Sequence, residues 1–394
     1  MKQEEAYKTL KGAIKSFEEK YHALFFVDII LNHTSFDSAW LLEHPDACYN
    51  IHNTPSLTSA YMLDQAIADF SNSIANKSCP DYTETSLRTE DQLEKLMDLI
   101  RNKVVGPLKL EEYFLMDENS LTEKFKQRLN ELAPNIKLSD SHDEELDDLY
   151  NIFVDDRLVQ ISKVINENLQ NLGVAPYGVT FSIDKVCEHF IKEPEKSSFD
   201  LLGQAIKKAN ELNLQRARAY LEEAFVNIRK VLDCRVKGNN HEITTTNPLV
   251  PPYFTNLKDG KTKAAHNGWM DGVDVLEDFV DSDKFYYLRR TINIWGDLIK
   301  LRYGKSKHDS PYLWKRMKNY VVSMAKVFHG LRIGNAQCTS IHVGEYFIRK
   351  ARKANPSIYV IAEIGSGSRE VDALFAKRIG INAIVREALN VFYF

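Results

Sequence analysis

Long apolar runs, paired cysteines and an excess of positive charge are all missing from this sequence of 394 residues. No stretch approaches 18 uninterrupted apolar residues and the N-terminus, residues 1–5, has no apolar h-region, so we expect neither a membrane span nor a signal peptide. The five scattered cysteines form no CxxC pair and predict reduced thiols in a cytoplasmic protein, rather than a disulfide frame or a zinc site. The net charge of −4 argues against nucleic acid or an anionic membrane as the main partner.

Both ends of the chain show alternating helix and strand patterns. A helical apolar face at 2–21 precedes a nearly continuous apolar run at 23–31, which favours a strand buried on both faces, as in parallel sheets. The C-terminal part repeats the pattern, with strands expected at about 327–333 and 358–364, helices at about 341–354 and 368–378, and a further apolar run at 381–385. This order predicts an α/β fold built from consecutive β/α units.

The middle of the chain has a different character. Long amphipathic stretches at about 89–105, 120–132 and 197–235 predict a helix-rich region, and the acidic run at 139–145 is typical of a solvated loop rather than a metal site. Aromatics and glycines are frequent at about 250–315, where His266, Asn267 and Trp269 lie close together. These aromatic side chains could stack on sugar rings while the polar side chains bind sugar hydroxyl groups. Alternatively, the aromatic residues belong to the hydrophobic core and the polar residues lie on the surface.

Polar side chains follow two of the expected strands. Asp28, Asn32 and His33 leave the end of the first apolar run, where ligands meet proteins of β/α folds, although such residues also cap the next element. Glu363 ends a later strand, where a buried carboxylate needs a partner or solvent. Residues 363–367 also read E-x-G-x-G, but the third glycine of a dinucleotide-binding turn is absent. A general acid of glycoside chemistry, in turn, needs a second carboxylate beside it.

A series of motifs resembles a known family. Residues 26–35 are similar to the first conserved region of the α-amylase clan, and further blocks resemble the glucanotransferase half of eukaryotic glycogen debranching enzymes. These blocks run in order from about residue 22 to 390: Trp40-Leu41, Glu43-His44-Pro45, Tyr49-Asn50, Asn53-Thr54-Pro55, Leu63-Asp64, 253–255, 265–269, 287–290, 295–297, 301–304, 311–314, 342–346 and 378–382.

The resemblance implies a partial TIM (β/α)8 barrel interrupted by a long insertion. Residues 1–34 would hold a helix and the third barrel strand, residues 35–325 the helix-rich insertion, and residues 326–394 the fourth and fifth strands with the start of the sixth. The remaining barrel strands and the family's amylo-1,6-glucosidase domain are expected to lie outside this sequence.

The resemblance also assigns a reaction centre, with one departure. The family's nucleophilic Asp closes the fourth strand and its acid/base Glu closes the fifth; Arg332, Asn335 and Glu363 match this pattern, but the nucleophile position is Gly334. Retaining transfer needs two carboxyl groups about 5–5.5 Å apart. Loss of the attacking one lowers turnover on the order of 10⁴-fold or more.

Further roles follow from the same resemblance. Asn32 and His33 would shape the site, with His33 facing the sugar. Asp28, a structural residue, would pair with Arg332 beneath the site, because a buried charge needs a partner. The expected glucan-binding residues are Asn32, His33, Arg332, His266, Asn267, Trp269 and His342. No cofactor and no metal is implied, and the expected ligand is glycogen or a malto-oligosaccharide. The function is then an impaired 4-α-glucanotransferase region, with a non-catalytic glucan-binding pseudoenzyme or a gene fragment as the alternative.

Overall fold

The computed structural model describes residues 2–138, 154–155, 180–270, 275–276, 278–280, 282 and 284–385. The acidic run at 139–145 lies outside these residues. The chain divides into two compact units, one of Met1–Asn50, Pro252–Lys284 and Ile292–Phe394, and a second of Ile51–Pro251 and Phe285–Thr291. Within the described ranges, no helix combines the length and apolar composition that crossing a membrane requires.

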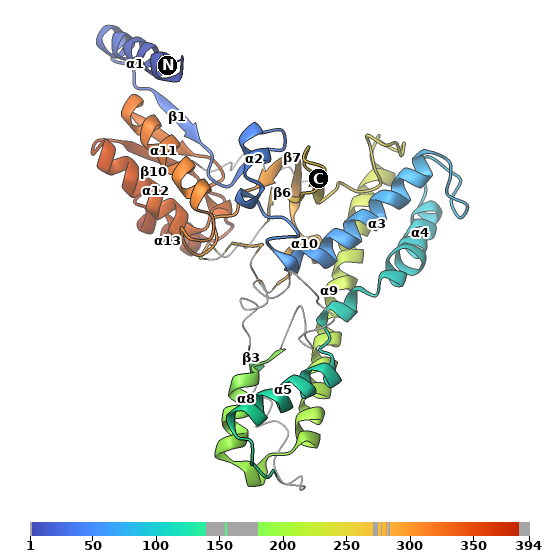
Figure 1. The fold of residues 1–394 in the computed structure, drawn as a ribbon. Helices are drawn as coiled ribbons and strands as arrows, with labels where there is room; N and C mark the ends of the chain where they lie inside the picture. The colour runs from blue at the N-terminus through green and yellow to red at the C-terminus, as the bar shows by residue number, and fades with distance from the viewer. Residues whose placement is uncertain are drawn as a thin grey trace. The chain divides into compact units, whose positions relative to one another are not determined.

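The first unit contains a parallel sheet, an antiparallel sheet and the helices that pack on them (Figure 1). Its helices are α1 (Lys2–Tyr21), α2 (Ala39–Glu43), α11 (Pro311–Val327), α12 (Ile341–Ala354) and α13 (Arg369–Ile379), with short 3₁₀ turns at Pro45–Ala47 and Ala336–Cys338. Its strands are β1 (Phe26–Ile29), β2 (His33–Ser35), β5 (Phe254–Asn256), β6 (Lys263–Trp269), β7 (Asn293–Lys300), β8 (Gly330–Ile333), β9 (Tyr359–Glu363) and β10 (Ala383–Val385).

The parallel sheet has the order β1-β8-β9-β10, and every neighbouring pair runs parallel. The predicted β/α units at both ends of the chain therefore join into one sheet, and the α/β prediction is confirmed. Local signals set the ends of the connecting helices. Ser368 accepts a hydrogen bond from Val371 N–H at the start of α13, and Gly380 ends that helix in the left-handed conformation that glycine tolerates best.

The two faces of this sheet differ in burial. Leu331, Ile333 and Val360 lie on the face that belongs to the main hydrophobic core, together with apolar residues of α11 and α12. On the other face Phe26 is 39% exposed and Tyr359 is 43% exposed. The expectation that the first strand is buried on both faces is therefore wrong. β1 pairs only with β8, and the described helices cover one face of the sheet.

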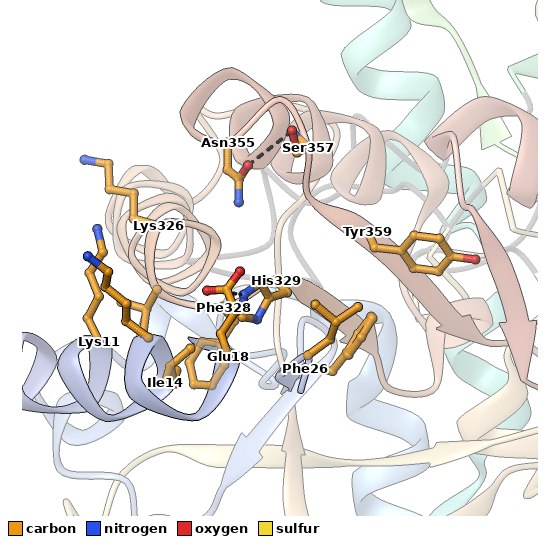
Figure 2. A pocket seen from close by; sticks show the side chains of 13 residues that line it. Lys11, Ile14, Glu18, Phe26, Lys326, Phe328, His329, Asn355, Ser357 and Tyr359 are labelled. Carbon is orange, nitrogen blue, oxygen red and sulfur yellow. Dashed lines mark hydrogen bonds and ion pairs between the residues drawn. The ribbon is translucent and has the colours of Figure 1, made fainter. Parts of the chain in front are cut away.

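A pocket of about 680 Å³ lies where β1, β8 and β9 begin (Figure 2). His329 in its wall is held from two sides, because the Phe25 N–H donates to Nδ1 at 3.0 Å and the Glu18 carboxylate lies 3.3 Å from Nε2. Strands of a parallel sheet begin at one edge and end at the other. This pocket is therefore at the opposite end of the strands from Gly334 and Glu363.

The antiparallel sheet has the order β2-β7-β6-β5. Between His266 and Gly268 the pairing of β6 with β7 shifts register, so Asn267 lies at a β-bulge. Bulges re-aim side chains and are frequent beside functional sites. Here the bulge directs the Asn267 amide towards β2, the strand that starts with His33.

Substitution of Gly268 by Ala is expected to destabilise this sheet by about 1–3 kcal/mol, because overpacking forces backbone shifts. A Cβ atom at Gly268 would lie 2.3 Å from the Asn293 carbonyl oxygen and 2.7 Å from Ile292 Cγ2. Gly296 on the neighbouring strand is the matched control, since a Cβ there meets no described atom within 4 Å. Urea unfolding of the two variants measures the difference, and equal losses would contradict the predicted clash.

In its described residues, the second unit is helical apart from one two-stranded sheet. Its helices are α3 (Thr58–Ala75), α4 (Glu90–Leu99), α5 (Glu118–Leu132), α8 (Ile183–Lys192), α9 (Phe199–Lys237) and α10 (Tyr286–Arg289), with short 3₁₀ or π segments at Pro55–Leu57, Ile100–Val105, Gly106–Leu108, Leu110–Phe114 and Pro194–Lys196. Strands β3 (Val154–Asp155) and β4 (Thr180–Phe181) pair antiparallel. The three predicted amphipathic stretches correspond to α4 with its π extension, α5 and α9. The long α9 contacts α4, α5 and α10 (Figure 1).

Candidate active site

Asn32 connects the end of β1 to the turn that follows β8. It is almost fully buried, and its side-chain N–H₂ donates to the carbonyl oxygen of Asn335 at 2.9 Å and to that of Gly334 at 3.4 Å. The two segments lie about 300 positions apart in the sequence but meet because β1 and β8 are hydrogen-bonded neighbours. Asn32 therefore sets where the backbone of residue 334 lies.

His33 begins β2 and is fixed by the side-chain amide of Asn32. Its Nδ1 lies 2.5 Å from Asn32 Oδ1 and 3.2 Å from Asn267 Nδ2. Because the Asn32 nitrogen already donates to the β8 turn, its oxygen is the acceptor, and this network assigns the proton of His33 to Nδ1. Asn267 donates to Asn32 Oδ1 at 3.3 Å, so its amide nitrogen is a neighbour of the His33 Nδ1–H group and not its hydrogen-bond partner. The assignment makes Nε2 of His33 a hydrogen-bond acceptor, a suitable partner for a sugar hydroxyl.

Burial lowers the pKa of His33 to about 4; the nearby Lys300 charge acts in the same direction, and the Asp297 carboxylate opposes both. The imidazole ring meets Trp295 edge to face, with ring centroids 5.8 Å apart. A neutral His33 at physiological pH follows from this lowered pKa, and it keeps Nε2 available as an acceptor.

This shift predicts a pH-dependent stability term. Above about pH 6.5, the ordinary histidine pKa, His33 is neutral in both states and contributes no pH dependence. Between pH 6.5 and about 4 the unfolded chain binds a proton that the folded chain excludes, so the free energy of unfolding falls as the pH falls. Below about pH 4 both states are protonated and the loss stops growing. Urea unfolding across this range should show a slope that is shallower in His33→Gln by the contribution of this one group, and an unchanged slope in His33→Gln would refute the assignment.

Arg332 lies between two carboxylates of the candidate site. Its Nη1 is 2.8 Å from Asp28 Oδ2 and its Nη2 is 3.2 Å from Glu363 Oε1. The predicted Asp28–Arg332 pair is thus present, but it is not the buried pair that we expected. The side chains of Asp28 and Arg332 are 56% and 35% exposed, because they lie on the sheet face that the described helices leave uncovered. Solvent screens such a pair, which limits its contribution to stability.

Glu363 and Gly334 meet at the ends of β9 and β8. Glu363 is mostly buried, and its Oε2 accepts a hydrogen bond from the Asn335 N–H at 3.2 Å. A Cβ atom at Gly334 would lie 3.8 Å from the same oxygen and 2.7 Å from Ile30 Cδ1. A side chain at 334 would therefore face Glu363, and the Ile30 methyl group takes part of the space that this side chain needs.

Three other predicted residues lie apart from this group of contacts. His266 is buried and its Nδ1 lies 2.9 Å from the Pro252 carbonyl oxygen. Trp269 ends β6 and is 39% exposed. The Nε2 atom of His342 lies 3.0 Å from the Gly304 carbonyl oxygen, and the His342 ring lies beside Trp314. The structure thus joins Asn267, but not these three, to Asn32 and His33.

Lys300 also belongs to this site, although the sequence motifs did not predict it. It pairs with His33 in the β2–β7 register, and its side chain is 1% exposed. The ammonium group donates to the Cys338 carbonyl oxygen at 2.7 Å, lies 3.3 Å from the Asp278 carboxylate and sits over the Phe279 ring at 4.4 Å. A lysine between Ile299 and Leu301 in a strand was the available signal, because a charged residue in an apolar run must find a partner.

Comparisons with known proteins agree with the resemblance read from the motifs. The family model for the glucanotransferase domain of glycogen debranching enzyme matches residues 1–359. The glycogen debranching enzyme of Saccharomyces cerevisiae is 36% identical over 398 residues, which cover 97% of this chain and 25% of that protein. The chain therefore spans about a quarter of the length of this relative. These matches confirm the predicted family: the chain belongs to the glucanotransferase-domain family of glycogen debranching enzymes.

Proposed function

We propose that this chain binds α-1,4-glucan at the carboxyl ends of β1, β8 and β9, as a 4-α-glucanotransferase region whose turnover is impaired. The observation that carries the proposal is the meeting of Glu363 with residue 334. The 3.8 Å between Glu363 Oε2 and the Cβ position of Gly334 supports a former pair of carboxylates, because retaining transfer needs two carboxyl groups about 5–5.5 Å apart.

In this mechanism Glu363 is the acid/base and residue 334 is the nucleophile. Glu363 would protonate the leaving oxygen while a carboxylate from residue 334 attacks the anomeric carbon and forms a glycosyl-enzyme. Glycine provides no attacking group, so protonation remains and the covalent step is lost. Asn32, His33, Arg332 and Asn267 would hold the glucan, with Trp269, His266 and His342 as further contacts.

The same proposal includes the architecture and the compartment. Four parallel strands in the order β1-β8-β9-β10 support consecutive strands, the third to the sixth, of a partial (β/α)8 barrel, with polar groups at their carboxyl ends as such barrels require. Residues 1–34 and 326–394 are its two pieces and residues 35–325 the insertion.

The absence of any disulfide among the five cysteines, all within the described ranges, supports a reducing compartment, the cytoplasm.

Two measurements on the purified chain test this function. Affinity electrophoresis in gels containing glycogen should show retardation, and incubation with maltoheptaose should redistribute chain lengths on the order of 10⁴-fold more slowly than an intact family member does. A specific observation favours binding without turnover as the second candidate function, since Ile30 occupies part of the space beside Gly334. Redistribution at the rate of an intact family member would overturn the impairment, and absence of retardation would overturn glucan binding.

A further inference from the structure

The pocket at the start of β1, β8 and β9 gathers positive charge in a chain whose net charge is −4. Lys11 and Lys15 of α1 and Lys326 of α11 line it, and Glu18 is the acidic residue among its described lining residues. The Glu18 carboxylate is already engaged, because it lies 3.3 Å from His329 Nε2. The pocket wall therefore presents more positive charge than its one carboxylate can balance.

The lysines of α1 are placed in a way that an isolated helix disfavours. Lys11 and Lys15 are four positions apart and so are neighbours on one helix face, where like charges repel each other. Lys15 lies 3.7 Å from Glu19, but solvent screens this exposed pair. Lys11 and Lys326 make no ion pair with any residue that the structure describes, although α1 and α11 pack against each other. Their ammonium groups are therefore available to a ligand from solution.

Aromatic rings form another part of the pocket wall. Phe26 and Tyr359 are 39% and 43% exposed, and their rings meet edge to face with centroids 5.9 Å apart. The Phe26 ring packs directly on Gly330, since a Cβ atom at Gly330 would clash with it. Figure 2 shows these two rings towards one side of the pocket and the side chains of Lys11 and Lys326 towards the other. The pocket thus has an aromatic end and a cationic end.

This arrangement matches a ligand that combines a phosphate group with a flat ring. A phosphate monoester carries about −1.5 to −2 charges at pH 7, and lysine binds phosphate as a point charge. A ring attached to the phosphate can lie against exposed aromatic side chains, and a supported ring such as Phe26 loses little entropy on binding. The volume of about 680 Å³ is within the range of about 300–1,000 Å³ that ligand pockets occupy.

We propose that this pocket, which we call the Lys11–Tyr359 pocket, binds a phosphate monoester of a ring compound, from a nucleotide or from a sugar phosphate. Lys11, Lys15 and Lys326 hold the phosphate, and the ring lies against Phe26 and Tyr359. The inference does not depend on the proposed function, because the pocket is at the opposite end of the strands from the candidate active site. A ligand bound there connects α1 with α11 and the sheet, so it also stabilises the folded chain.

Isothermal titration calorimetry of the full chain with adenosine monophosphate and with glucose 6-phosphate tests the pocket and distinguishes the two sources. Lys11→Gln and Lys326→Gln change exposed residues, and each should weaken binding on the order of 10-fold because a charged hydrogen-bond donor is lost. Tyr359→Ala should weaken binding by a similar factor through lost stacking. Lys8→Gln is the matched control, an exposed lysine of the same helix that does not line the pocket.

Several outcomes would overturn the proposal. One is that wild type binds neither ester, and another is an equal loss of affinity in Lys8→Gln and Lys11→Gln, because the effect would not depend on position. Adenosine or inorganic phosphate binding as tightly as the preferred ester would also overturn it, since one end of the pocket would then contribute nothing. Retardation by glycogen should be unchanged in all four variants, so failure of this inference is distinguishable from failure of the proposed function.

Discussion

Gly334→Asp combined with Ile30→Val is expected to restore formation of a glycosyl-enzyme, raising its rate on the order of 10⁴-fold above wild type. Asp supplies the attacking carboxylate opposite Glu363. The Ile30→Val change removes Cδ1, the atom that lies 2.7 Å from the Cβ position of residue 334. Gly334→Asp alone should gain less, because the new side chain first has to displace Ile30. Intact-protein mass spectrometry after incubation with an α-maltosyl fluoride donor measures the covalent adduct.

A carboxylate added elsewhere near the centre provides the control for this experiment. Gly365 follows the strand that ends in Glu363, and a Cβ there meets no described atom within 4 Å. Gly365→Asp therefore adds the same charge to the adjoining loop without a clash and without a group at the nucleophile position. Adduct formation in Gly365→Asp, or its absence from the folded double variant, would contradict the assignment of residue 334.

Lys300→Met is expected to lower the free energy of unfolding by about 3–5 kcal/mol, because removal of one partner leaves a buried charge uncompensated. The change withdraws the ammonium group from Asp278 and from the Cys338 carbonyl oxygen. That oxygen belongs to the 3₁₀ turn after Gly334, so the turn loses its attachment to β7. Urea unfolding followed by circular dichroism measures the loss.

Two further variants show whether this loss comes from the buried charge. Lys305→Met alters an exposed lysine and should change stability little. Lys300→Met with Asp278→Leu should recover much of the loss, since replacement of a whole buried pair by apolar groups is often close to neutral. Nuclear magnetic resonance should also find the His33 pKa above about 4 in Lys300→Met, because a nearby positive charge has been removed. A loss equal to that of Lys305→Met would refute the role of Lys300.

Much of the secondary structure could be predicted because its signals are local. Periodic apolar faces predicted α1, α5 and α9, and the helix expected at about 341–354 corresponds to α12. The strands of the parallel sheet were also predicted, although β1 is shorter than the apolar run at 23–31. The antiparallel strands β2, β5, β6 and β7 were not predicted. The burial of β1 could not be predicted, because whether a strand is covered on one or two faces depends on elements distant in the sequence.

The site was predictable only in part, for the same reason. Motif spacing placed Asn32, His33 and Glu363 at strand ends, where the structure brings them to one region. Asn267 lies next to His33 because of a β-bulge. A bulge depends on how two strands pair, and no local sequence pattern predicted it. Trp40 and Tyr312 were parts of motifs, but their separation by about 270 positions concealed that their ring centroids lie 6.2 Å apart.

The sequence by itself determined the family, the α/β class and the identity of the residue at position 334, because these depend on residue type and order along the chain. Only the tertiary structure decided what Gly334 means for its surroundings: Ile30 fills part of the space beside it, and Lys300 holds the turn that follows it. Both are contacts between segments that are distant in the sequence. Such contacts form when β1 and β8 pair and β7 packs beside them. Protein interiors are closely packed, so a neighbouring side chain such as Ile30 occupies part of the space that a side chain at position 334 would take.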